Sequence, residues 1–304
     1  IGFVIVIAVI LSQSRAGIMS IAFICFILLN MKFFHKRWVK YLSLLCFALL
    51  LSGCYWMKKD SADGRLLIWR CSVSMVKDAP WLGHGIGSFE ARYMDYQADY
   101  FRQYGLNRYS MLADNVKHPF NEYLGVLINF GIVGLALLLG IVGALVYCYR
   151  QNPTQEKKIA LYALLSIGVF SFFSYPFTYP FTWMVTSLAV LMLTADYLKR
   201  IKIGTWGRNI MYSAVLMGFF LGQVRLGART QSERSWQEAS VLALCHSYDE
   251  ALPYYVSLKH RFEDNPYFLY NYAAVFTEAK EYEKALKVAL ECRKYWADYD
   301  LELL

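Results

Sequence analysis

Long apolar blocks alternate with short polar breaks along most of the chain. The blocks lie near residues 1–13, 17–34, 41–56, 122–149, 159–176, 181–198 and 209–226. An apolar helix of about 18 or more residues can cross the hydrocarbon layer of a membrane, because its backbone groups bond within the helix. With 57% hydrophobic and 18% charged residues, the pattern predicts an all-α, polytopic membrane protein with seven spans in residues 1–226.

The first apolar block begins at Ile1, with neither Met nor a basic leader before it. No cleavable signal peptide is evident there. We therefore expect the chain to be a fragment of a longer protein, in which further spans complete the helical bundle.

Basic residues concentrate in every second short connection between the apolar blocks. Short basic loops stay on the cytoplasmic side of a membrane. The alternation predicts that the long loop 57–121 and the tail after residue 226 lie outside the cytoplasm, on the periplasmic face of a Gram-negative inner membrane. The basic residues that define it are Lys32, Lys36, Arg37 and Lys40, then Arg150, Lys157 and Lys158, then Lys199, Arg200, Lys202 and Arg208.

The formal charge of +8 does not indicate nucleic-acid binding. From residue 226 onward the chain has 9 Lys/Arg and 13 Asp/Glu, so the positive excess belongs to the membrane part. There it follows the loops, as membrane topology requires.

No metal site or cofactor site is evident in the sequence. The seven cysteines have no CxxC or other metal-ligand spacing, and the loop 57–121 has no clear cluster of metal-binding carboxylates. Cys54 and Cys71 flank that loop, where they could form a disulfide or stay free.

Two arginines on the outer face could bind an anion. Arg15 lies in the polar break between the first two blocks, and Arg65 and Trp69 share one face of an amphipathic helix that starts near residue 64. Both arginines could simply contact lipid headgroups. Alternatively, a planar guanidinium fits phosphate oxygens, and an indole beside it could hold a sugar ring.

Closely spaced glycines surround His84 in the segment Ala79–Glu90. The segment resembles a nucleophile elbow or a phosphate loop only superficially, because the required strand, turn and helix are absent. We interpret it as a tight turn that brings the backbone close to another segment. His84 could bind substrate or be structural.

His118 lies at the mouth of the fourth apolar block. Pro119 favours a first helical turn, and Asn121 and Glu122 follow one turn later, on the side of His118. A histidine in this position could be structural. Flanked by an amide and a carboxylate at membrane depth, it could also act as a base near neutral pH.

The sequence Tyr-Pro-Phe-Thr occurs twice in succession, at residues 175–178 and 179–182. The simplest interpretation is an aromatic belt at the membrane surface with helix breaks at the prolines. Contact with a carbohydrate or a lipid is the alternative.

The tail, residues 227–304, contains a repeat. Tyr248–Leu252 recurs as Tyr282–Leu286 with an offset of 34 residues, the period of tetratricopeptide (TPR) repeats. Asn265-Pro266 is expected to open a repeat helix, and the packing positions fall on Leu269, Tyr272, Ala273, Phe276 and Ala285. Such a module binds a protein partner or braces the membrane domain.

Four motifs in order give the chain a family resemblance. These are Ser14-Arg15-Ala16-Gly17, Arg65 with Trp69, Pro80 to Phe89, and His118 with Asn121-Glu122-Tyr123-Leu124 before a glycine-rich span. Together they resemble the O-antigen ligase and polymerase superfamily over roughly residues 1–200. Pro119 and Phe120 inside the histidine motif, and the appended repeats, depart from the family pattern.

The resemblance implies a glycosyltransferase at the periplasmic face. Members of that family transfer a glycan from undecaprenyl diphosphate to an acceptor hydroxyl. It implies that Arg15 and Arg65 hold the diphosphate and that His118 activates or orients the acceptor. Fixed guanidinium groups stabilise the charge of a departing diphosphate, and a neutral imidazole can accept the hydroxyl proton. We expect metal-independent, inverting transfer in which Trp69, His84, Asn121 and Glu122 bind substrate.

Several functions stay open at this stage. The acceptor could be lipid A-core, as for a ligase, a growing glycan, as for a polymerase, or a protein side chain, as for an oligosaccharyltransferase. Non-enzymatic alternatives are a membrane scaffold with partner-binding repeats and a transporter of lipid-linked glycans. The scaffold alternative explains the tail but leaves Arg15, Arg65 and His118 unexplained.

Overall fold

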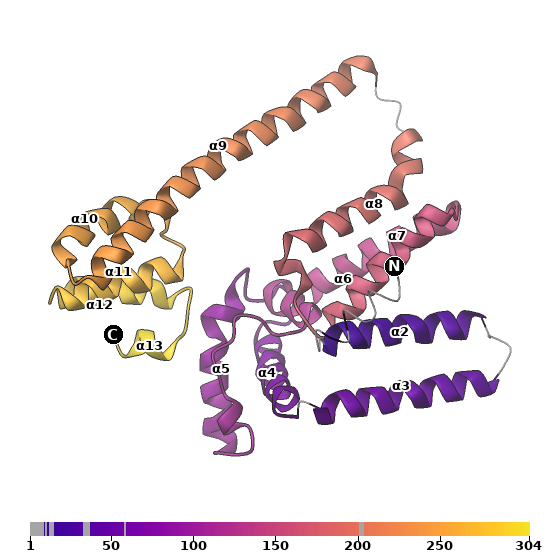
Figure 1. The fold of residues 1–304 in the computed structure, drawn as a ribbon, viewed down its shortest axis with the longest axis horizontal. Coiled ribbons are helices and arrows are strands. Elements are labelled where there is room, and N and C mark those ends of the chain that lie inside the picture. The colour runs from indigo at the N-terminus through magenta and orange to yellow at the C-terminus, as the bar shows by residue number, and fades with distance from the viewer. Residues whose placement is uncertain (1–8, 10, 12–14, 33–36, 58, 201–203) are drawn as a thin grey trace. The chain divides into compact units, whose positions relative to one another are not determined.

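The computed structural model describes residues 9, 11, 15–32, 37–57, 59–200 and 204–304. Within this part of the chain all regular structure is helical and no strand occurs. The all-α prediction is therefore confirmed. Figure 1 shows the order of the helices along the chain.

The chain divides into two compact units. The first comprises Ile1–Phe89 and Asp95–Leu198, and the second Glu90–Met94 and Lys199–Leu304. Helix α9 (Thr205–Leu244) runs without interruption through residue 226, where the sequence suggested a domain boundary. That boundary stays a prediction.

Five helices of the first unit, α2, α3, α6, α7 and α8, correspond closely to apolar blocks, whereas α4 and α5 lie in the predicted loop 57–121. Helix α2 packs against α3 and α7, and α6 packs against α7. The first apolar block lies almost entirely outside the described residues. The helices are α2 (Arg15–Lys32), α3 (Arg37–Met57), α4 (Lys59–Asp78), α5 (Ser88–Tyr104), α6 (Glu122–Gln151), α7 (Gln155–Ser171) and α8 (Pro180–Arg200), with the short 3₁₀ helices η1 (Ser110–Leu112) and η2 (Pro176–Thr178).

Helix α4 is amphipathic, as predicted for the segment around Arg65 and Trp69. Its buried face includes Leu67, Ile68, Cys71 and Met75, and it packs against α6. Cys71 is a free thiol, and burial raises its pKa to about 11. The side chain of Cys54 lies outside the described residues, so the structure does not test a disulfide between Cys54 and Cys71.

Helix α6 is broken at Gly131, where the residues Pro80–Gly85, here called the 80–85 loop, lie against it. Gly131 has φ 62° and ψ −161°. Ile132 N donates to Pro80 O (2.8 Å) and Val133 N to Trp81 O (3.2 Å), while His84 N donates to Ile128 O (2.7 Å). The loop thus replaces the helical partners that the break removes. The prediction of a tight turn in close backbone approach is confirmed.

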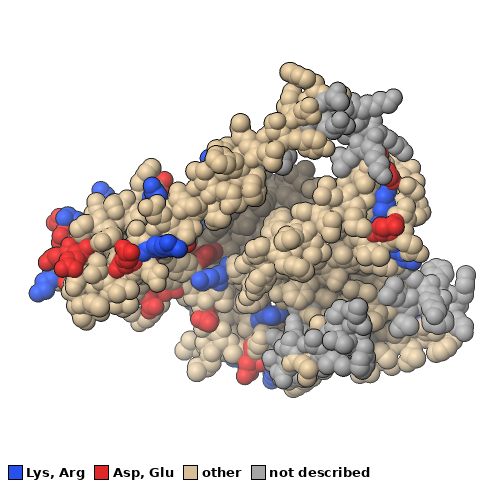
Figure 2. Space-filling view, turned by 45° about the horizontal axis from the view of Figure 1, so that its top comes forward, with Lys and Arg blue, Asp and Glu red and all other residues tan. Residues whose placement is uncertain are grey.

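One helix in the described part of the chain, α6, is long and apolar enough to cross a membrane by length and composition. A shorter apolar stretch is Gly17–Ile27. The six other predicted spans stay predictions. Large apolar side chains on α3, α6, α8 and the first half of α9 are nevertheless exposed. On the face shown in Figure 2 much of the described surface carries neither Lys or Arg nor Asp or Glu.

The basic connection before α7 contains an ion pair that the sequence did not indicate. Lys157, in the first turn of α7, is buried, and its Nζ lies 2.7 Å from Asp196 Oδ2 on α8. Asn152 Nδ2 donates to the same oxygen (2.8 Å). The charge of Lys157 therefore ties two helix ends together rather than facing solvent.

The second unit has an aromatic core. Helix α9 packs on α10 (Tyr248–Leu258), α10 on α11 (Pro266–Glu278) and α11 on α12 (Tyr282–Arg293). The short helix η3 (Lys259–Arg261) lies between α10 and α11, and α13 (Tyr299–Glu302) follows α12. Asn265 caps α11 through bonds from Tyr267 N and Phe268 N, and Pro266 is its first residue. All five predicted packing residues are buried: Leu269, Tyr272, Ala273, Phe276 and Ala285. The TPR assignment itself stays a prediction.

Candidate functional site

A small cavity lies where the loop before α6 meets the segment between α7 and α8. Its volume is about 190 Å³, below the range of about 300–1,000 Å³ for pockets that take drug-sized ligands. It therefore suits a group the size of a single sugar ring. We call it the His118 cavity; it is lined by His118, Pro119, Asn121, Glu122, Tyr175, Phe177 and Thr178.

The cap of α6 fixes the shape of the loop on one side of the cavity. Asn121 Oδ1 accepts hydrogen bonds from Tyr123 N (3.0 Å) and Leu124 N (3.1 Å), which satisfies two amides of the first helical turn. Just before the cap, Phe120 adopts a left-handed backbone conformation with φ 52°. That conformation costs a non-glycine residue roughly 1–2 kcal/mol, so the surrounding contacts must stabilise it.

Glu122 connects the two sides of the cavity. Its Oε1 accepts a hydrogen bond from the backbone N of Phe177 (3.1 Å), in η2. The carboxylate is therefore held at the wall of the cavity. The expectation that Pro119 opens the helix, with Glu122 one helical turn after His118, is wrong: α6 begins at Glu122, Asn121 caps it, and Phe120 has a left-handed backbone, so residues 118–121 form a loop.

Stacked aromatic rings lead away from His118. The centroid of its imidazole lies 4.5 Å from that of Tyr175, with 31° between the planes. Tyr175 also stacks on Tyr179 at 6.5 Å and meets the edge of Phe120 at 5.2 Å. The Tyr-Pro-Phe-Thr repeat, predicted from sequence as an aromatic belt or a carbohydrate contact, thus forms one wall of the cavity and a partly exposed extension of it.

Arg65 reaches the same loop from α4. Its Nη1 donates to Phe173 O (2.7 Å), and its guanidinium carbon lies 5.1 Å from the ring centroid of Phe120. Phe120 therefore contacts both Arg65 and Tyr175, the ring that stacks on His118. Arg65 and Trp69 do not line the His118 cavity, but two rings in contact link Arg65 to His118, 53 positions away in the sequence.

Trp69, one helical turn after Arg65, supports this arrangement. Its Nε1 donates to the carbonyl oxygen of buried Pro119 (3.0 Å). The indole thus holds the loop that carries His118, and this bond uses its only hydrogen-bond donor.

The structure does not place His84 or Arg15 at the His118 cavity. His84 Nε2 donates to Met75 O (2.8 Å), and its ring meets the edge of Tyr96; His84 is not among the residues that line the His118 cavity. Arg15 begins α2, which packs on α7, but its side chain lies outside the part of the chain that the structure describes.

Phe120 and Phe173 belong to the site although the sequence did not single them out as functional, whereas Tyr175 lies in the repeat for which a carbohydrate contact was one alternative. Phe120 was noted only as a departure from the family motif. Its position inside that motif, between a histidine and an asparagine, was the available signal. Tyr123, next to Glu122, adds a further tie, because its hydroxyl donates to Gly168 O (2.8 Å) on α7.

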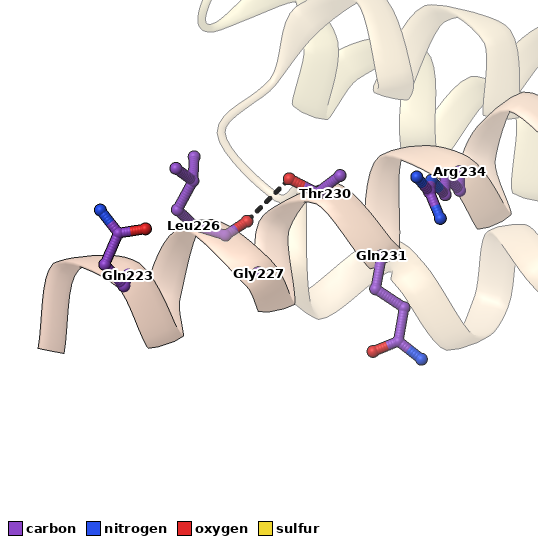
Figure 3. A pocket seen from close by; sticks show the side chains of 6 residues that line it. All are labelled: Gln223, Leu226, Gly227, Thr230, Gln231 and Arg234. Atoms are coloured by element: carbon purple, nitrogen blue, oxygen red, sulfur yellow. Dashed lines mark hydrogen bonds between the residues drawn. The ribbon is translucent and has the colours of Figure 1, made fainter. Parts of the chain in front are cut away.

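No other described part of the chain brings candidate functional side chains from several elements together in a pocket. The described residues contain no group of three or more His, Cys, Asp or Glu side chains that could hold a metal ion. A hollow of about 570 Å³ is lined only by residues of α9, and Figure 3 shows them along a single helix, so no groups from another element meet them there. Its lining residues are Gln223, Leu226, Gly227, Thr230, Gln231 and Arg234.

Comparison with known proteins gives one result. Neither the search of curated proteins nor the search of solved structures found a match. A family model described as O-antigen ligase matches residues 1–139. The match contains Arg65 and the loop 118–122 and ends within α6, before the Tyr175 side of the cavity. This part of the chain is therefore similar to the O-antigen ligase family of membrane glycosyltransferases, and the match supports a function of that broad kind.

Proposed function

We propose that the chain transfers a glycan from undecaprenyl diphosphate to a hydroxyl of lipid A-core, in the manner of an O-antigen ligase, at the His118 cavity. The observation that carries the proposal is the convergence of Arg65 and His118 on the Phe120–Tyr175 pair. A cation able to bind phosphate, linked through two rings to a candidate base, supplies the two groups that glycosyl transfer from a diphosphate requires.

In this proposal His118 accepts the proton of the acceptor hydroxyl. The hydroxyl oxygen forms a bond to the anomeric carbon while the bond from that carbon to the diphosphate oxygen breaks, and the electron pair leaves with the diphosphate. A single displacement of this kind inverts the anomeric centre. A base with a pKa near neutral is suited to the proton transfer. Glu122, at the same wall, orients the acceptor or stabilises the protonated imidazole.

Arg65, together with Arg15, would stabilise the departing diphosphate. Charge builds on the phosphate oxygens as the glycosidic bond breaks, and a preorganised guanidinium lowers the energy of that state. The bond from Arg65 Nη1 to Phe173 O fixes the position of one nitrogen. The guanidinium has five N–H donors in all, and its planar fork fits the oxygens of a phosphate. No step of the proposal requires a metal ion or a cofactor.

Trp69 and Asn121 would act as positioning residues. Both use their side-chain hydrogen bonds on the backbone of the loop 119–124. Their effect on transfer is therefore expected to pass through the position of His118. His84, bonded to Met75 O, would act one step further away, through the 80–85 loop.

The proposal places the protein in the bacterial inner membrane, with the His118 cavity on the periplasmic face and the tail able to contact a protein partner. A growing glycan or a protein side chain could replace lipid A-core as acceptor, because the groups in the cavity recognise a hydroxyl in each case. The banding pattern of lipopolysaccharide distinguishes these acceptors. In a deletion strain, core without any chain indicates a ligase, and core with one repeat unit indicates a polymerase.

The test is the accumulation of lipid-linked glycan in cells that carry Arg65→Ala or His118→Ala, with membrane insertion verified for each variant. Matched controls are Arg102→Ala and His260→Ala, which change exposed side chains. We expect accumulation with the first pair and none with the second. Transfer that survives both Arg65→Ala and His118→Ala would refute the proposed function.

A further inference from the structure

The break in α6 divides its 30 residues into two parts of different character. The capping residue Asn121 and, within the helix, Glu122 and Asn129 all precede Gly131, whereas residues 132–146 contain no polar or charged side chain. At 1.5 Å per residue the whole helix is about 45 Å long, longer than the roughly 30 Å of hydrocarbon. The 20 residues after Gly131 are sufficient to cross it. The hydrocarbon boundary therefore falls close to Gly131, with Glu122–Phe130 outside.

The 80–85 loop is fixed at that level of the helix. Beside the bonds from Ile132 and Val133, Gly85 N donates to Asn129 O (3.0 Å). A Cβ on Gly83 would lie 2.5 Å from Asn129 C, and a Cβ on Gly131 would lie 2.2 Å from Trp81 O. Backbone therefore rests directly on backbone, and the height of the loop is set by the helix.

The side chains that this loop and its continuation present outward are apolar. Trp81 is 69% exposed, Leu82 74% and Ile86 84%. Large apolar side chains exposed together need a partner, and Trp is enriched where hydrocarbon meets headgroups. The neighbouring residues of the span, Ile132 and Val133, are exposed as well. The apolar surface of the loop is thus continuous with that of the helix part that crosses the hydrocarbon.

We propose that Trp81, Leu82 and Ile86 insert into the outer leaflet of the bilayer and set the depth of the His118 cavity. Glu122 lies nine residues before Gly131, about 14 Å along the helix. The cavity is thereby held at the height of the headgroups and not within the hydrocarbon. The partner of this surface is the lipid bilayer itself, and the proposal does not depend on the reaction at His118.

The test uses spin labels on cysteines introduced one at a time into the full chain, with its native cysteines replaced, in vesicles of phosphatidylethanolamine and phosphatidylglycerol. Labels at Leu82 and Ile86 are compared with labels at Leu106 and Met111, which are 90% and 94% exposed. A label at Leu137, which is 65% exposed in the second part of α6, reports whether that part crosses the bilayer.

We expect the labels at Leu82, Ile86 and Leu137 to collide with oxygen and to be protected from a water-soluble nickel complex, and those at Leu106 and Met111 to behave in the opposite way. Protection at Leu137 with full nickel access at Leu82 and Ile86 would overturn the proposal, as would nickel access at all three. Protection of Leu82 only when a polyprenyl phosphate is added would overturn it too, by assigning the surface to a lipid substrate.

Fluorescence gives a second measurement on a chain with its cysteines intact. Brominated lipids quench tryptophan within the bilayer. Trp81→Phe should remove a share of the quenching, whereas Trp69→Phe, which changes an indole bonded to Pro119 O, should not. Equal quenching before and after Trp81→Phe would also overturn the proposal.

Discussion

Two histidines lie in neighbouring loops of the first unit, and their environments differ. His84 donates a hydrogen bond to Met75 O, and its loop rests backbone to backbone on α6. His118 lines a cavity, stacks on Tyr175 and shares an aromatic pair with Arg65. His84 lies between two glycines, His118 precedes a proline, and both histidines are half-buried. The difference teaches that the remote partner of each loop, and not its local motif, distinguishes a structural histidine from a candidate base.

The largest expected effect separates the two histidines directly. His118→Ala should lower the rate of glycan transfer by about 10²–10⁴-fold, the usual contribution of a general base. His84→Ala should remove one hydrogen bond, change the transfer rate by less than about tenfold, and lower the free energy of unfolding by about 1–3 kcal/mol. Transfer rates in proteoliposomes and unfolding in detergent measure the two effects. Equal losses of rate in the two variants would remove the distinction.

The next effect concerns the charge beside His118. Arg65→Ala should lower the transfer rate by about 10²–10³-fold, because a donor to the departing diphosphate is lost. Arg65→Lys keeps the charge but loses the planar fork, so its rate should fall between those of wild type and Arg65→Ala. If the Arg65→Lys variant transferred glycan more slowly than the Arg65→Ala variant, the rate would depend on how the side chain packs against Phe120 and not on its charge.

A smaller effect tests the structural role of the His84 loop. Gly83→Ala places a Cβ 2.5 Å from the backbone of Asn129 and should lower the free energy of unfolding by about 1–3 kcal/mol. Gly85→Ala is the matched control, because Gly85 also has positive φ but nothing lies within 4 Å of its Cβ position. Thermal unfolding in detergent gives both values. Equal destabilisation would mean that backbone strain alone is being measured.

The smallest effect tests the support of the His118 loop. Trp69→Phe keeps an aromatic ring and removes the bond to Pro119 O, a loss of about 1 kcal/mol. We expect a few-fold lower kcat with an unchanged KM for the acceptor, since the base is displaced and no substrate contact is lost. A raised KM with unchanged kcat would instead indicate that the indole binds substrate.

Sequence alone predicted the local features well. The apolar blocks predicted α2, α3, α6, α7 and α8, the spacing of Arg65 and Trp69 predicted the amphipathic α4, and Asn265-Pro266 predicted the start of α11, whereas α5 was not predicted. Each of these depends on residues within one or two helical turns, where side-chain pattern and capping decide the structure.

The long-range features could not be predicted in the same way. The contact of the 80–85 loop with Gly131 joins segments about 50 positions apart, and glycine spacing indicated a close approach without indicating to what. Phe120 contacts both Arg65 and Tyr175 and has a left-handed backbone, a conformation that no local preference favours. The ion pair of Lys157 with Asp196 was likewise hidden, because a basic loop suggested topology alone.

The central claim is that the imidazole of His118 accepts the acceptor proton beside Arg65, and the most direct measurement is chemical rescue. The purified variant His118→Ala is reconstituted with lipid-linked glycan and acceptor. The cavity has a volume of about 190 Å³ with His118 present, and removal of the imidazole side chain enlarges it, so that added imidazole can enter. We predict that imidazole restores a measurable part of the lost transfer rate in this variant and none in Arg65→Ala. A wild-type rate in His118→Ala without imidazole, or a lost rate that imidazole does not restore, would contradict the account.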